Sequence, residues 1–93
     1  MSDLKKKKKM IDDLYDTLLR LKDRKQCKAL LEDLCTKQEV EQMACRIKAA
    51  KLLMAGETYN EVIEKTNISS ATLSRVSRCV KYGKGYNEML KGK

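Results

Sequence analysis

Residues 58–78 constrain the fold more than any other part of this chain, because they hold two helix-start signals eleven positions apart. The segment Thr58-Tyr59-Asn60-Glu61 has the Thr-x-x-Glu pattern of a capping box, in which the hydroxyl and the carboxylate each accept a backbone hydrogen bond. Ser69 can cap a following helix with its own hydroxyl. We therefore expect a short helix, a tight turn and a second helix that continues to about Tyr82.

The turn between the two helices is predicted at Asn67 and Ile68. Asn67 is the best non-glycine candidate for the left-handed conformation that ends a helix, and the side chain of Ile68 can pack into the core beneath the turn. In the second helix, the spacing directs Leu73 and Val76 inward. The same spacing sends these residues outward: Ser70, Ala71, Ser74, Arg75 and Arg78. This arrangement is typical of a helix-turn-helix unit. The outer face of its second helix carries small side chains near the start and cationic side chains further along.

That outer face has the side chains that a recognition helix needs for duplex DNA. Short side chains let the helix backbone approach base edges, and arginines can reach guanine edges or phosphates. The predicted base-proximal residues are Ser70, Ala71, Ser74, Arg75 and Arg78, and the predicted phosphate contacts are Lys65, Thr72 and Lys81. The plainer alternative is an ordinary surface helix whose arginines face water.

The rest of the chain also favours helices, since its 93 residues include four glycines and no proline. Apolar spacing predicts helices over residues 10–22 and 25–35. A capping box at Thr36-Lys37-Gln38-Glu39 starts a third helix, and Gly56 ends it. The predicted inward residues of this third helix are Val40, Met43, Ala44, Ile47, Ala50 and Met54. A last short helix is expected at residues 86–91.

These elements predict an all-α fold in one structural domain. A flexible basic arm is expected over residues 1–9, a helical dimerisation core over 10–57, a helix-turn-helix head over 58–82 and a short C-terminal helix or tail over 83–93. The first three helices carry more apolar surface than a two-helix head requires, and so short a chain buries a modest core alone. We therefore expect a homodimer in which two copies share one core.

The net charge of +8 is unevenly distributed along the chain. Residues 1–10 and residues 58–93 each carry a net +4, whereas residues 11–57 are neutral. This pattern suggests an anionic partner, and nucleic acid fits it best. The run from Lys5 to Lys9 is either a solvated arm or an arm that adds non-specific attraction to phosphate. The following Asp12, Asp13 and Asp16 exclude a signal peptide.

Membrane, metal and enzyme chemistry are not expected. Without an apolar run of about 18 residues, the protein is predicted to be soluble and cytoplasmic. The four cysteines (Cys27, Cys35, Cys45 and Cys79) form no CxxC pair and the chain has no histidine, so free thiols in a reducing compartment are favoured over zinc. The chain also lacks a general base for neutral pH, a glycine-rich phosphate loop and a nucleophile elbow, so we expect no enzymatic activity and no cofactor.

The segments TYNE and SSATLSRVSRC, both within residues 34–83, carry a resemblance to a known family. This part of the chain resembles the Trp-repressor-like family, and most closely its YerC/YecD branch. The resemblance implies an all-α fold, an intertwined homodimer and DNA-binding heads built from the helix-turn-helix. It also implies a sequence-specific transcriptional regulator that acts as a repressor on double-stranded DNA.

The resemblance further implies a tryptophan site made by Thr36, Arg46 and Arg75. The three residue types are present, but two walls of the site differ. Val76 stands where the ligand-binding form has glycine, so its side chain would fill the space of the indole. Asp33 stands at an apolar position, and its carboxylate would repel the carboxylate of the ligand. We therefore expect no bound tryptophan and a structural or phosphate-facing role for Arg46.

A protein-interaction module is the alternative function. In that case the helix pair docks an acidic protein partner, and DNA is irrelevant; Glu61 and Glu64 lie near the head. The net charge of +4 over residues 58–93 favours nucleic acid instead.

Overall fold

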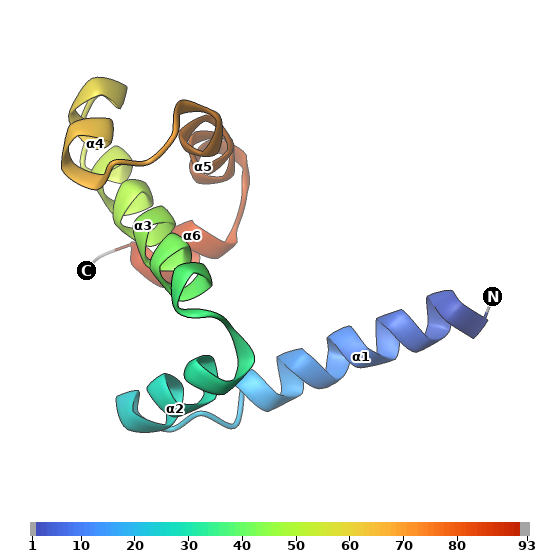
Figure 1. Cartoon of the computed structure of the whole chain (residues 1–93). Helices are drawn as coiled ribbons and strands as arrows, with labels where there is room; N and C mark the ends of the chain where they lie inside the picture. Colours follow the sequence, from blue (N-terminus) through green and yellow to red (C-terminus); the bar gives the residue numbers. More distant parts are fainter. Residues whose placement is uncertain (1, 92–93) are drawn as a thin grey trace. The chain divides into compact units, whose positions relative to one another are not determined.

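A computed structural model describes residues 2–91 and contains no strand among them. The helices in chain order are α1 (Ser2–Leu18), α2 (Arg24–Leu34), α3 (Lys37–Met54), α4 (Tyr59–Thr66), α5 (Ser70–Tyr82) and α6 (Gly85–Leu90) (Figure 1). The all-α prediction is confirmed. The chain divides after Cys35 into two compact units, and each is described by itself.

In the first unit, the first helix begins earlier than residue 10, where apolar spacing predicted its start. Residues 2–9 are helical, because α1 begins at Ser2 and ends at Leu18 (Figure 1); Met1 lies outside the described residues. Lysine is a good helix former, and no proline or glycine interrupts residues 2–18. Asp3 also lies in the first turn, where a negative charge is favourable.

The second helix of this unit starts from a signal that the sequence analysis missed. Asp23 is the N-cap of α2, and its Oδ1 accepts a hydrogen bond from the backbone N–H of Gln26 at 2.8 Å. Neither α1 nor α2 contains a buried residue. The large apolar side chains of α1 are exposed: Leu4, Met10, Ile11, Leu14, Tyr15 and Leu18. Taken by itself, the first unit therefore has exposed apolar faces.

In the second unit, α3 packs against α4, α5 and α6, and α4 packs against α5. The buried core consists of Ala49, Ala50, Val62, Ile68, Leu73 and Val76. Half-buried apolar side chains, among them Ile63, Val80, Tyr86 and Leu90, pack against this core. The small alanines at positions 49 and 50 let α3 approach the other helices closely.

The predicted inward face of α3 is wrong in part. Ala50 is buried as expected, but Ala44 and Ile47 are exposed, and Ala49 is fully buried instead. The helices of the second unit cover the side of α3 that carries the two alanines, and they leave the stripe through Ala44 and Ile47 more exposed. The chain divides after Cys35, and α3 packs with the helix-turn-helix in the second unit. The roles predicted for residues 10–57 in dimerisation and for residues 58–82 in DNA binding stay predictions.

Candidate functional site

The first helix of the candidate site is held at its start by the predicted capping box. Thr58 Oγ1 accepts a hydrogen bond from the backbone N–H of Glu61 at 3.2 Å, and Glu61 Oε1 accepts one from the N–H of Thr58 at 2.8 Å. The hydrogen bond from the Thr58 backbone is the main reason why the pKa of the Glu61 carboxyl is lowered. Val62 follows at the centre of the core, with no exposed surface.

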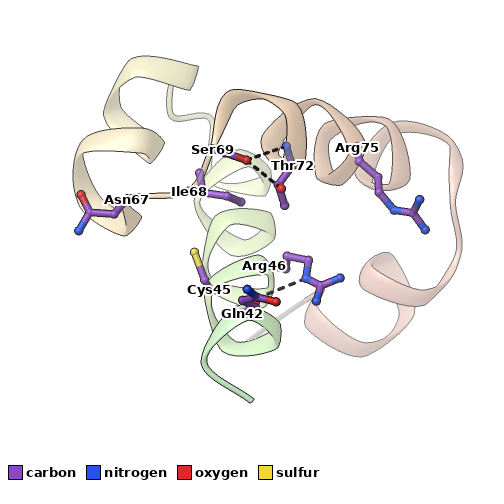
Figure 2. A pocket seen from close by; sticks show the side chains of 8 residues that line it. All are labelled: Gln42, Cys45, Arg46, Asn67, Ile68, Ser69, Thr72 and Arg75. Carbon is purple, nitrogen blue, oxygen red and sulfur yellow. Dashed lines mark hydrogen bonds between the residues drawn. The ribbon is translucent and has the colours of Figure 1, made fainter. Parts of the chain in front are cut away.

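The turn after α4 is fixed on both sides, which confirms the prediction for Asn67. This residue is left-handed, with φ 61° and ψ 20°, and its N–H donates to the carbonyl of Ile63 at 2.8 Å. Thr66 Oγ1 donates to the carbonyl of Val62 and accepts from the N–H of Ile68. Ile68 is buried beneath the turn, whereas Figure 2 shows the Asn67 side chain directed away from the other labelled residues.

Ser69 caps α5 as predicted. Its Oγ accepts a hydrogen bond from the backbone N–H of Thr72 at 3.2 Å and donates one to Thr72 Oγ1 at 2.9 Å (Figure 2). The Thr72 hydroxyl is therefore oriented by the cap, and its own hydrogen is free to donate to a further group. A contact between Thr72 and phosphate stays a prediction.

The two faces of α5 differ as the spacing predicted. Leu73 and Val76 are buried, and Ser77 joins them with 6% of its surface exposed. The five predicted base-proximal residues are all exposed: Ser70, Ala71, Ser74, Arg75 and Arg78. The helix presents small side chains at its start and two guanidinium groups further along, and Lys81 is exposed in its last turn.

Lys65 differs from the other predicted phosphate contacts because it already has an anionic partner. Its Nζ lies 2.7 Å from Oε1 of Glu57, and this hydrogen bond is the main reason why the pKa of Lys65 is raised. It is the only ion pair among residues 2–91. Half of the Lys65 side chain is exposed, so the pair competes with solvent. A phosphate contact at Lys65, which no finding tests, would have to displace Glu57.

A hollow of about 550 Å³ lies between α3 and the start of α5 (Figure 2). Its lining includes Arg46 and Arg75, which the sequence analysis had placed together, and also Gln42 and Cys45, which it had missed. Arg46 Nε donates to the carbonyl of Gln42 at 3.3 Å. Gln42 lies one helical turn before Arg46, so helical spacing from Arg46 could have identified it.

Thr36 does not line that hollow. Its hydroxyl accepts from the backbone N–H of Glu39 at 3.0 Å, and the Glu39 carboxylate accepts from the N–H of Thr36, so Thr36 caps α3. Of the three residues considered for a tryptophan site, the structure brings two to one hollow, and the third has a structural role.

A second hollow of about 510 Å³ lies among α3, α5 and α6. Arg46, Arg75 and Val76 line one part, and Tyr86 and Met89 of α6 line another. The sequence analysis predicted a short C-terminal helix at residues 86–91 but not its contacts. The observed α6 begins at Gly85, and Asn87 Nδ2 donates to the carbonyl of Val80 at 2.8 Å, which ties α6 to the end of α5.

Residues 2–91 include no group of three or more cysteine or acidic side chains placed to hold a metal ion. The four cysteines are free thiols, and each is half-buried. Across the same residues, each helix is too short or too polar to reach from one side of a membrane to the other.

A short capped helix, a left-handed turn and a second helix with an exposed outer face define a helix-turn-helix protein. The sequence model of the Trp repressor protein family matches residues 9–93, and the chain belongs to that family. This finding confirms the resemblance that residues 34–83 indicated.

Known relatives agree with this assignment. The chain is 41% identical over 81 residues to the uncharacterized protein YerC of Bacillus subtilis (strain 168). This match covers 87% of this chain and 78% of YerC. A crystal structure of a candidate Trp repressor from Staphylococcus aureus matches with a TM-score of 0.82 and 34% identity, over 87% of this chain and 82% of that one. A TrpR-like protein from Eubacterium eligens ATCC 27750 matches with a TM-score of 0.81 and 37% identity, over 86% and 84% of the two chains.

Proposed function

We propose that this protein is a sequence-specific transcriptional regulator that binds duplex DNA as a homodimer through α5. The observation that carries the proposal is the asymmetry of α5. Leu73 and Val76 are buried, while the opposite face exposes small residues and two arginines. Membership of the Trp repressor family supports the same function. The protein-interaction alternative gains no specific support from the site.

The exposed residues of α5 suit the chemistry of the major groove. Ser70 and Ala71 are short enough to let the start of the helix approach the bases. Arg75 and Arg78 can each donate two hydrogen bonds to a guanine edge. No acidic side chain of the described residues pairs with either arginine, so both guanidinium groups are free to meet DNA. Thr72 and Lys81 lie on the same helix, and the proposal gives both of them a role in contacting phosphate.

A homodimer accounts for the uncovered apolar surface. The exposed apolar residues of α1 and the stripe through Ala44 and Ile47 on α3 would share a core with a second copy. Two copies related by two-fold symmetry would present two α5 helices to half-sites about 34 Å apart along the duplex. Occupancy of such a site would block transcription from an overlapping promoter, so we infer a repressor.

Tryptophan is not required in this proposal. Val76 lines the hollow between α3, α5 and α6, so its side chain occupies space beside Arg46 and Arg75. Asp33 has no positively charged partner in the described residues. We therefore expect DNA affinity to be the same with and without tryptophan.

Selection of bound fragments from a random duplex library tests the proposal. The expected result is an enriched palindromic sequence that the protein binds more tightly than unrelated DNA. Arg75→Ala and Arg78→Ala should each weaken this binding by about 1–3 kcal/mol and relax the sequence preference. Arg20→Ala removes an exposed arginine outside α5 and serves as the control. Failure to enrich any sequence, or equal effects of all three variants, would contradict the proposal.

A further inference from the structure

A second cationic surface lies on α1, apart from the helix-turn-helix. The lysine segment, Lys5 to Lys9, consists of five consecutive exposed side chains within one continuous helix. None of the five forms an ion pair with an acidic side chain of residues 2–91. The proposed function of α5 leaves this charge unexplained.

The charge order along α1 is unfavourable with respect to the helix dipole. Cations near a helix N-terminus and anions further along oppose the helix dipole. Here the lysines come first, Asp12, Asp13 and Asp16 follow, and the last turn holds no basic residue. Lysines three and four positions apart also repel one another, as Lys5 and Lys9 do. The helix dipole therefore gives no reason for the position of the lysines, whereas an external anion would.

The lysine segment presents positive charge all around the helix. Successive residues are rotated by about 100°, so five in a row surround the axis. Lys7 and Lys8 interrupt the apolar side between Leu4 and Ile11. A helix that lies on a lipid surface keeps its lysines on the side opposite its apolar residues, whereas Lys7 and Lys8 lie on the side of Leu4 and Ile11. A chain of phosphates, which can be met from any side of the helix, is a better match.

We propose that the lysine segment is a second DNA-binding element, which contacts backbone phosphates and adds affinity without regard to sequence. This inference rests on the proposed function of α5 and assigns the two regions different tasks. Residues of α5 read the sequence, and the lysine segment contributes the salt-dependent attraction.

The test compares two variants that each remove three charges. One carries Lys6→Gln, Lys7→Gln and Lys8→Gln in the lysine segment. The matched control carries Lys22→Gln, Lys25→Gln and Lys28→Gln, three exposed lysines of the same unit. Glutamine and lysine have similar helix propensities, and circular dichroism checks that helix content is retained. Affinity is measured against the selected duplex and an unrelated duplex over a range of salt concentrations.

The lysine-segment variant should lose affinity for both duplexes by the same factor, so that the ratio of the two affinities is unchanged. The slope of log affinity against log salt should fall by about 0.9 for each lysine that contacts a phosphate, and the control should change it much less. Equal losses in the two triple variants would overturn the inference, because net charge alone would then explain them. Binding to vesicles of anionic phospholipid is measured alongside, and a loss confined to the vesicles would also overturn the inference.

The two proposals fail in distinguishable ways. If Arg75→Ala abolishes sequence preference while the lysine-segment variant binds like the wild type, the inference is wrong and the proposed function stands. If the wild type shows no sequence preference but the lysine segment still sets its affinity for any duplex, the proposed function is wrong and the segment keeps its role.

Discussion

Ser69 makes two hydrogen bonds at the start of the second helix of the helix-turn-helix. Its hydroxyl accepts from the N–H of Thr72 and donates to the Thr72 hydroxyl, so it both starts α5 and orients a predicted phosphate contact. The neighbouring Ser70 is exposed and has no such bond. Two adjacent serines of the same chain therefore have separable roles, one structural and one available to a ligand.

Replacing Ser69 with alanine should lower the free energy of unfolding by about 1 kcal/mol, the usual cost of losing an N-cap. Ser70→Ala is the matched control and should change it by less than about 0.5 kcal/mol. Urea unfolding of both variants measures the difference. An equal effect of the two substitutions would contradict the assignment of Ser69 as the cap.

Glu61 makes part of the stability of α4 dependent on pH. Its pKa is lowered from an ordinary value of 4.5, chiefly by the hydrogen bond from the Thr58 backbone. Because the folded pKa is the lower one, this contribution is complete above the unfolded pKa and is lost as the pH falls through the folded pKa.

Thermal unfolding of Glu61→Gln should therefore depend less on pH than that of the wild type. Between about pH 6 and about pH 3 the melting temperature of the wild type should fall further than that of the variant, because residue 61 can take up a proton only when it is glutamate. Glutamine retains the capping hydrogen bond, so the two proteins should be closest at the acidic end. Parallel curves at all pH values would show that the capping box does not involve the ionised carboxylate.

At the scale of the elements, local signals in the sequence predicted more than distant contacts did. The caps at Thr36, Thr58 and Ser69 and the left-handed turn at Asn67 are confirmed, because each depends on hydrogen bonds within four residues. The predicted start of the first helix at residue 10 was wrong, because apolar spacing does not register a run of lysines, although lysine favours a helix and nothing in the run breaks one.

Contacts between elements were harder to predict. The buried side of α3 was only partly right, since helical spacing alone does not tell which side the neighbouring helices cover. The same limit applies to the candidate site. Helical spacing identified the exposed face of α5, but it did not bring Tyr86 and Met89 of α6 beside Arg46 and Arg75.

Two glycines at the junction of α5 and α6 have different roles. A Cβ at Gly83 would lie 2.7 Å from the carbonyl oxygen of Cys79, within the backbone of α5. A Cβ at Gly85 would meet nothing within 4 Å. The absence of a side chain at Gly83 therefore permits a close approach of the chain to the end of α5. At Gly85 there is no such close approach.

Gly83→Ala should destabilise the protein by about 1–3 kcal/mol, because backbone atoms of α5 must move to accommodate the new carbon. Gly85→Ala should be neutral or stabilise it by about 0.4–1 kcal/mol, since it only restricts the unfolded chain. Chemical unfolding of the two variants provides the comparison. Equal destabilisation by both would mean that the junction is tighter at Gly85 than the structure indicates.

At the scale of the whole molecule, the uncovered apolar faces bear most directly on the proposed homodimer. No side chain of α1 is buried, although Leu14 and several neighbours are large and apolar. Such faces are rare on monomers and common where two chains meet.

Sedimentation equilibrium should therefore give twice the mass of one chain. Leu14→Glu should shift the equilibrium towards monomer, because a carboxylate would enter the shared core without a partner. Asp16→Gln changes charge on the polar side of the same helix and should leave the dimer intact. A monomeric wild type would contradict the proposed assembly and leave the assignment of α5 unaffected.

An amide NMR titration with the selected duplex tests the central claim most directly, since it reports which residues of the protein meet DNA. We predict that the largest chemical-shift changes fall on residues 69–78, at the exposed start and arginine-bearing side of α5. If those amides stay unchanged while the duplex binds, then α5 is not the recognition helix and the account is wrong.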